Sequence, residues 1–136
     1  PLPFDDNHFD FICTYETIEH VFDYSTYVDE LTRVLEKNGV LILTCPNVMW
    51  EWVHWLSAII NINHSEGPHR FRTRKQLYRC IEKNNLEVLN ENNTIFLPFN
   101  HPLSIWMDKL FTKILPCCVK SLLGLRRTLV MRKHSS

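Results

Sequence analysis

The sequence predicts an α/β domain whose sheet is mostly parallel and ends with an antiparallel strand. Residues 9–13 and 40–45 are short and largely apolar runs, typical of buried strands. Between them, residues 25–36 repeat apolar side chains at helical spacing, and Asn38-Gly39 follows as a helix stop. Residues 125–133 alternate in character, which predicts a last strand. Strand, helix and strand in succession indicate a right-handed crossover between parallel neighbours.

The rest of the chain adds helices and one more strand. Residues 49–60 are rich in aromatic side chains and are expected to be helical. Thr73 and Gln76 form a capping-box pattern that begins a further helix. We expect a strand from Leu86 and a helix with an apolar stripe from Pro102.

Size and composition are those of one globular domain. The chain has 136 residues, of which 45% are hydrophobic and 22% charged, enough to form a core. The net charge is zero, but acidic residues gather in residues 1–36, whereas basic residues dominate from residue 105 onward. A basic tail can meet nucleic acid or anionic lipid, but such a run is most often a solvated face. We expect no nucleic acid partner.

Cysteine usage and hydropathy predict a cytoplasmic protein. The five cysteines have no CxxC spacing, which argues against a disulfide framework and a structural zinc site. The apolar stretch 103–125 is interrupted by charged residues and Pro116, too often for a spanning helix. Any membrane association is therefore expected to be peripheral, through this helix and the basic tail.

A polar trio follows the first predicted strand. Glu16, Glu19 and His20 lie within the stretch "TYETIEHV", and a helix there would place them on one face. Because parallel strands end at the same edge of a sheet, this stretch and "PNVMW" after the second strand should border one crevice. We expect a ligand to bind in that crevice.

The segment "LPFDDNHFDFICTYETIEHVFDYSTYVDELTRVLEKNGVLILTCPN" resembles the second half of a class I S-adenosylmethionine-dependent methyltransferase of the type 11-like group. The order of "LPF", "FD", the strand, "ExxEHV" and "GxLxLxxPN" carries the resemblance. It weakens over "HRFRTRKQLYRCIEKNNLEVL" and is loose beyond Thr94. The resemblance implies a partial Rossmann-like methyltransferase fold and S-adenosylmethionine as cofactor.

The family's glycine-rich cofactor turn has no counterpart in this chain. The three glycines, Gly39, Gly67 and Gly124, are isolated, which also excludes a dinucleotide motif or a P-loop. We therefore expect residues 1–136 to be the C-terminal part of one methyltransferase domain. In that prediction residues 1–94 are core-like, and residues 95–136 form a helix plus the last strand, as a substrate lid or a membrane-facing element.

The resemblance assigns three residues to the cofactor side. Leu2 would lie near the adenine, and Thr14 and Tyr15, at the end of the first strand, would approach the methionine part. Core packing of Leu2 is the plain alternative. Thr14 could instead cap a turn through its hydroxyl.

The resemblance also gives the polar trio a catalytic role. Some quinone-pathway O-methyltransferases hold a divalent cation with an ExxEH pattern, so Glu16, Glu19 and His20 are candidate metal ligands. A metal would lower the pKa of the acceptor hydroxyl. Two alternatives stay open: His20 as a general base without metal, and local structural hydrogen bonding.

Asn47 and His69 are candidate substrate residues. Asn47 follows the second strand, and the resembling enzymes place a loop histidine before an "RF" pair, where His69 stands. The spacing of His64 and His69 invites a zinc interpretation, but no cysteine lies close to complete such a site.

The predicted function is methyl transfer from S-adenosylmethionine to oxygen or carbon of a small-molecule or lipid-like acceptor, as part of a longer chain. We expect the isolated 136 residues to be inactive. Two alternatives use the same residues: a non-catalytic binding or regulatory module on this scaffold, and a peripheral membrane-surface protein.

Overall fold

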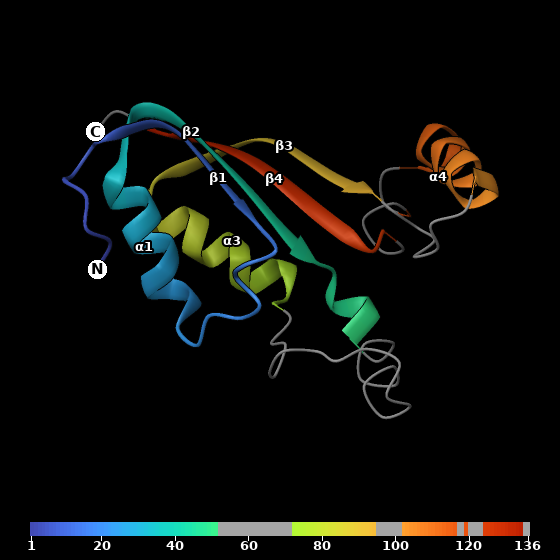
Figure 1. The fold of residues 1–136 in the computed structure, drawn as a ribbon, viewed down its shortest axis with the longest axis horizontal. Coiled ribbons are helices and arrows are strands. Elements are labelled where there is room, and N and C mark those ends of the chain that lie inside the picture. The colour runs from blue at the N-terminus through green and yellow to red at the C-terminus, as the bar shows by residue number, and fades with distance from the viewer. Residues whose placement is uncertain (52–71, 95–101, 117–118, 120–123, 135–136) are drawn as a thin grey trace.

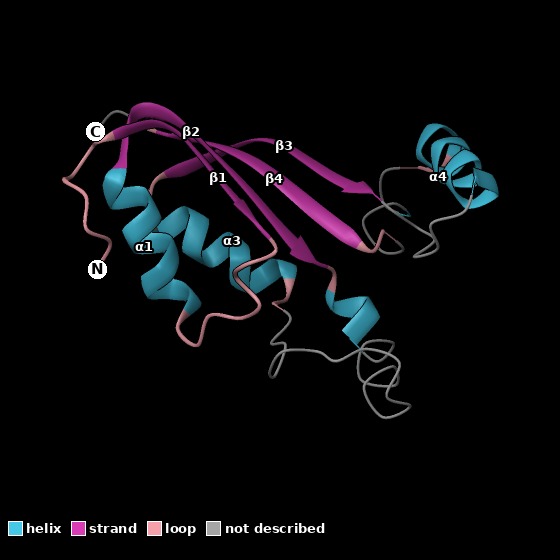
Figure 2. Cartoon of the chain, viewed as in Figure 1, coloured by secondary structure: helices cyan, strands magenta, loops and turns pink. Residues whose placement is uncertain are grey.

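The computed structural model describes residues 1–51, 72–94, 102–116, 119 and 124–134 (Figures 1 and 2). Eight elements lie within these described ranges. In chain order they are β1 (Phe9–Tyr15), α1 (Tyr24–Val34), β2 (Leu35–Pro46), the 3-10 turn η1 (Val48–Trp50), α3 (Arg74–Lys83), β3 (Leu86–Thr94), α4 (Pro102–Ile114) and β4 (Arg126–Lys133).

The described strands form one mixed sheet in the order β1-β2-β4-β3. β1 and β2 are parallel, whereas β4 lies antiparallel between β2 and β3. The α/β class and the antiparallel last strand are thus confirmed. The antiparallel direction places the start of β4 beside the carboxyl ends of the other strands.

The first helix ends earlier than its sequence pattern predicts. α1 ends at Val34, and Leu35 already pairs with Phe9 in the sheet. Asn38, at φ 63°, and Gly39 therefore form a bulge before regular pairing resumes at Val40, and not a helix stop. A Cβ on Gly39 would lie 2.8 Å from the Glu36 carbonyl oxygen, so only glycine fits this close approach.

Side-chain caps fix the starts of both packed helices. The Asp23 carboxylate accepts hydrogen bonds from the backbone N–H groups of Ser25 and Thr26 at the start of α1. Thr73 and Gln76 form the predicted capping box of α3. The predicted helix over residues 49–60 lies mostly outside the described residues; its described start is η1 and Glu51.

The core lies between the sheet and two helices. α1 and α3 pack on the same face of the sheet, as Figure 1 shows. Burial alternates along β4, where Arg127, Leu129 and Met131 face these helices and are buried. The aliphatic core is completed by Ile18, Val28, Leu31, Leu35, Leu41, Leu43, Leu77, Ile81 and Leu86.

The outer edge of the sheet at β1 is apolar and open. Phe11 and Tyr15 on this edge strand are 53% and 55% exposed, and no described strand pairs with the free side of β1. A groove of about 270 Å³ runs between β1 and α1, lined by Leu2, Phe4 and their apolar neighbours. An edge of this kind can accept another strand.

Candidate active site at the carboxyl ends of the strands

The candidate site lies where β1 and β2 end and β4 begins. The register pairs Tyr15 with Thr44, and Pro46 with Arg126, so three strands meet at this edge. The stretch that follows β1 carries Glu16, Glu19 and His20. The predicted convergence of the loops after the first two strands on one edge is confirmed.

Glu16 is held by the start of β4. Its backbone has a φ of 45°, which is uncommon for a residue other than glycine, and its N–H donates to the Thr44 hydroxyl at 3.0 Å. Its carboxylate forms an ion pair with the Arg126 guanidinium, which also lies 4.7 Å from the centre of the Tyr15 ring. Arg126 thereby fixes two of the predicted site residues, Tyr15 and Glu16.

Glu19 and His20 differ in exposure. Glu19 is 4% exposed, and its Oε2 has no hydrogen-bond partner in the described structure. Burial raises the pKa of this carboxyl group above its ordinary value. His20 is exposed, and its backbone N–H donates to the Thr17 carbonyl oxygen. Of the trio, Glu19 is the side chain with an unused, desolvated functional atom.

The arrangement of Glu16, Glu19 and His20 differs from the metal site that the sequence predicted. Residues 16–20 form a bend and turn, and not a helix, so the expected common face does not exist. The Glu16 carboxylate is already paired with Arg126, and His20 is exposed while Glu19 is buried. Within the described residues, no group of three His, Cys, Asp or Glu side chains is placed to hold an ion.

The three predicted cofactor residues have different environments. The Thr14 hydroxyl is 2.6 Å from the Tyr27 hydroxyl and is buried against α1. Tyr15 is exposed at the open edge, beneath Arg126. Leu2 lines the apolar groove, and its backbone N–H donates to Glu30 at 2.9 Å. Tyr15 and Leu2 are thus accessible from the open edge, whereas Thr14 is tied to the helix.

Asn47 is buried and joins η1 to the start of β4. Its amide nitrogen donates to the Gly124 carbonyl oxygen at 2.9 Å, and its side-chain oxygen accepts from the Met49 N–H. These contacts hold Asn47 between η1 and the segment before β4, and its predicted role in substrate binding stays a prediction. His64 and His69 lie outside the described residues, so the substrate role of His69 stays a prediction.

Sequence reasoning missed the two arginines that begin β4. Arg126 holds Glu16, while Arg127 is 3% exposed and lies 3.1 Å from a Glu91 oxygen. The sequence did contain a signal for them, namely two adjacent arginines at the start of the predicted antiparallel last strand. Because an antiparallel strand begins where its neighbours end, its first residues lie at the carboxyl edge of the sheet. Their partners Glu16 and Glu91 are distant in sequence and could not be assigned from it.

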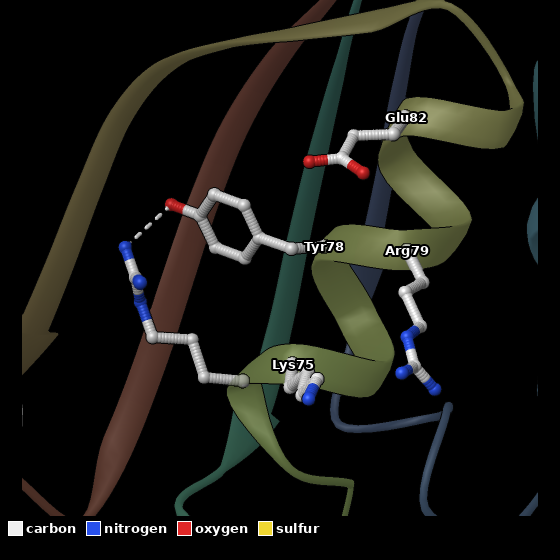
Figure 3. Close-up of a pocket in the computed structure, with 5 residues that line it drawn as sticks. Lys75, Tyr78, Arg79 and Glu82 are labelled. Carbon is white, nitrogen blue, oxygen red and sulfur yellow. Dashed lines mark hydrogen bonds between the residues drawn. The ribbon is translucent and has the colours of Figure 1, made fainter.

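A second hollow lies along α3 and does not form a comparable site. It has a volume of about 530 Å³ and is lined by Arg74, Lys75, Tyr78, Arg79 and Glu82. Figure 3 shows Tyr78 and Glu82 on one side of the helix and Arg79 on the other. These side chains therefore do not converge on one point.

The described residues have a Rossmann-like methyltransferase fold. Its features are the order and directions of the strands, the two helices on one face of the sheet and the polar residues at the carboxyl edge. A family model described as a methyltransferase domain matches residues 2–91, more than half of the chain. The chain belongs to this family of class I S-adenosylmethionine-dependent methyltransferases. Membership implies S-adenosylmethionine as the cofactor.

A curated relative agrees with this assignment. The ubiquinone biosynthesis O-methyltransferase of Bartonella tribocorum is 27% identical over 100 residues, which cover 68% of this chain and 40% of that protein. The chain thus spans less than half the length of this relative.

Two solved structures share the fold. A SAM-dependent methyltransferase from Thermotoga maritima is 20% identical with a TM-score of 0.66, over 98% of this chain and 60% of that chain. Geranyl diphosphate C-methyltransferase from Streptomyces coelicolor A3(2) is 18% identical with a TM-score of 0.58. The match covers 99% of this chain and 51% of that chain. At these identities the similarity establishes the fold alone.

Proposed function

We propose that this chain forms the acceptor side of an S-adenosylmethionine-dependent methyltransferase within a longer protein. The reaction is methyl transfer to oxygen or carbon of a small-molecule or lipid-like acceptor. The observation that carries the proposal is Glu19, a buried carboxyl group with an unpartnered oxygen at the carboxyl edge of the parallel strands. The glycine-rich turn that grips the cofactor would come from another part of the protein.

Glu19 is suited to accept the proton of the acceptor. When bound, S-adenosylmethionine supplies an electrophilic methyl group on a sulfonium. The acceptor O–H would donate to Glu19 Oε2, and that oxygen would take up the proton as the acceptor oxygen bonds to the methyl carbon. The bond between the methyl carbon and the sulfonium would break, with S-adenosylhomocysteine as the leaving group. Positioning of the reacting atoms contributes most of the rate enhancement. Proton removal contributes a smaller factor, about 10²–10⁴.

The remaining predicted site residues position this machinery. Arg126 holds the Glu16 carboxylate and covers Tyr15, which keeps the end of β1 in place. Tyr15 and Leu2, exposed at the open edge, are proposed to border the cofactor. Asn47 holds the chain after β2 against the start of β4.

Oxygen is the favoured acceptor atom. The curated relative is named as an O-methyltransferase of ubiquinone biosynthesis, and it matches 68% of this chain. A buried carboxyl group also suits a hydroxyl acceptor, since that reaction releases a proton. We therefore place a hydroxyl-bearing small molecule or lipid-like molecule first.

Radiolabelled methyl transfer tests the proposal. The full-length protein that contains this chain is incubated with S-adenosylmethionine labelled at the methyl group and a panel of phenolic and prenylated phenolic acceptors. We expect label in at least one acceptor. Cofactor binding without transfer to any acceptor, and without loss of label to water, would instead favour a non-catalytic binding module.

A second proposal concerns the exposed apolar helix α4. Four of its large apolar side chains, Leu103, Ile105, Trp106 and Ile114, are 47–66% exposed. α4 lies apart from the two packed helices (Figure 2) and makes no extensive contact with another described element. None of the helices in the described part is long and apolar enough to cross a bilayer. We propose that α4 lies in the surface of an anionic membrane, where a lipid-like acceptor would be met.

Two lysines on α4 make the membrane proposal testable. Lys109 and Lys113 are exposed, and each lysine near an anionic surface contributes about 1 kcal/mol of binding. Replacing both with glutamine should weaken binding to phosphatidylglycerol vesicles by roughly thirtyfold in flotation. Lys75→Gln with Arg79→Gln on α3 is the matched control. Equal flotation of both double variants, or none by the wild type, would contradict the proposal.

A further inference from the structure

Arg33, in the last turn of α1, is the centre of a hydrogen-bond network that holds the start of the described chain. Its guanidinium donates to the backbone carbonyl oxygens of Phe4 at 3.0 Å and Leu2 at 3.1 Å. It also donates to the Asp6 carboxylate at 2.6 Å and to the two Glu30 oxygens at 3.0 and 3.1 Å. These bonds match in number the five N–H donors of a guanidinium, so the group is fully used.

Glu30 completes the attachment of Leu2. Its Oε2 accepts a hydrogen bond from the Leu2 N–H at 2.9 Å, so both backbone polar groups of Leu2 are held by side chains of α1. The hydrogen bond from Arg33, together with that from Leu2, lowers the pKa of Glu30 to about 2. The carboxylate is therefore ionised at physiological pH and can serve as an acceptor for both groups.

Two backbone hydrogen bonds extend this attachment towards β1. The Asn7 N–H donates to the Arg33 carbonyl oxygen at 2.9 Å, and the His8 N–H donates to the Val34 carbonyl oxygen at 2.8 Å. Both carbonyl groups lie at the helix end, where no further turn of helix is available to pair with them. Residues 2–8 form neither helix nor strand, so their order depends on the end of α1.

The segment held in this way presents apolar side chains at the open edge. Leu2 is 36% exposed and Phe4 is 44% exposed, and both line the groove between β1 and α1. The Phe4 ring packs edge-to-face against Phe9, with the ring centroids 4.9 Å apart. Ordering a segment costs conformational entropy, and here it leaves apolar side chains exposed. Core formation therefore does not account for the order, whereas a ligand at this edge does.

We propose that Arg33, together with Glu30, is a positioning residue for the cofactor and holds Leu2 in place against the adenine of S-adenosylmethionine. The inference rests on the proposed function, in which Leu2 borders the cofactor. Both side chains act through the backbone of Leu2 and not on the reacting atoms. A segment that is already ordered loses less conformational entropy on binding, so this role raises cofactor affinity and leaves the methyl-transfer step unchanged.

The first test separates cofactor affinity from turnover in the full-length protein. In Arg33→Lys the charge is kept, but one ammonium group cannot serve two carbonyl groups and two carboxylates. We expect calorimetry to show a Kd for S-adenosylhomocysteine about tenfold higher than in the wild type, the size of about one hydrogen bond. The kcat at saturating S-adenosylmethionine should stay within about twofold.

Lys83→Gln is the matched control for this variant. It breaks the 2.7 Å ion pair with Asp29 that joins the same helix to α3, away from residues 2–8, and should leave the Kd unchanged. An unchanged Kd in a folded Arg33→Lys variant would overturn the inference. A fall in kcat as large as the loss of affinity, or an equal loss of affinity in Lys83→Gln, would also overturn it.

Hydrogen exchange on the unmodified full-length protein decides the matter if Arg33→Lys does not fold. Exchange in residues 2–8 should slow when S-adenosylhomocysteine is bound, because the ligand then contacts a segment that α1 already holds. Residues 86–94, which form β3 on the opposite edge of the sheet, are the reference and should exchange at an unchanged rate. No slowing in residues 2–8 at saturating ligand would overturn the inference.

These measurements separate the inference from the proposed reaction. Weaker cofactor binding in Arg33→Lys, with no methyl transfer by the wild type to any acceptor, would support the positioning role and remove the reaction. Methyl transfer by the wild type, with equal cofactor affinity in both proteins, would do the reverse. No binding of S-adenosylhomocysteine by the wild type would overturn both.

Discussion

At the scale of single residues, the side chains on the two faces of β1 have different roles at the carboxyl end of the strand. The Thr14 hydroxyl is bonded to Tyr27 in α1, while the neighbouring Tyr15 is exposed and lies beneath Arg126. Alternation along the strand produces this division, because successive side chains point to opposite faces. One residue therefore anchors the strand to its helix, and the next is available at the site.

Removing the Tyr27 hydroxyl should lower stability. Tyr27→Phe leaves the buried Thr14 hydroxyl without this partner, and we expect a loss of about 1–2 kcal/mol in the free energy of unfolding. Urea denaturation of the full-length protein measures it. Tyr24→Phe, on the same helix, is the control. If Thr14→Val costs as much in the Tyr27→Phe background as in the wild type, the hydrogen bond is not the cause.

At the scale of elements, Glu91 joins β3 to α3 and β4. Burial opposes its ionisation, yet hydrogen bonds from Arg74 and Tyr78 and the charge of Arg127 hold the pKa of Glu91 below its ordinary value. A carboxyl group with a lowered folded-state pKa stabilises the fold above its unfolded-state pKa. That stabilisation is lost as the pH falls through the folded-state pKa.

Acid denaturation should therefore depend on Glu91. We expect the free energy of unfolding to fall as the pH drops below about 4.3, the ordinary glutamate pKa. Glu91→Gln should be less stable than the wild type at pH 7, with a shallower loss on acidification. Glu36→Gln, at an exposed position, is the control. Parallel pH curves for the wild type and Glu91→Gln would contradict the role of this carboxylate.

Local patterns in the sequence predicted the elements well and their long-range contacts poorly. The capping box of α3, the parallel pair β1 and β2, and the antiparallel β4 follow from periodicity and turn residues. The early end of α1 could not be predicted, because pairing of Leu35 with Phe9 overrides local helical preference. Likewise, the "ExxEH" spacing suggested a helical face, but Thr44 and Arg126 hold Glu16 in a bend.

At the scale of the whole molecule, the described structure is open on one side. α1 and α3 cover one face of the sheet, and no described helix covers the other (Figure 1). Together with the free edge of β1 and its exposed Phe11, this leaves apolar surface that a complete methyltransferase domain would bury. The chain aligns with only 60% of the Thermotoga maritima structure, which agrees with that view.

The isolated 136 residues should therefore self-associate. We expect sedimentation to show oligomers or aggregates and thermal melting to be broad, because an open apolar edge pairs with other chains. Phe11→Lys should raise the monomer fraction more than Leu89→Lys, on the opposite edge strand β3. A soluble monomer with a sharp, cooperative melt would contradict the prediction.

The most direct test of the assigned chemistry is to measure turnover and cofactor affinity together in a Glu19→Gln variant of the full-length protein. If Glu19 accepts the acceptor's proton, turnover should fall by about 100-fold or more, while the Kd for S-adenosylmethionine stays within about twofold of the wild type. Glu36→Gln should change neither. Unchanged turnover in Glu19→Gln, or equal losses of turnover and cofactor affinity, would show that Glu19 is structural and that the acceptor side has been placed wrongly.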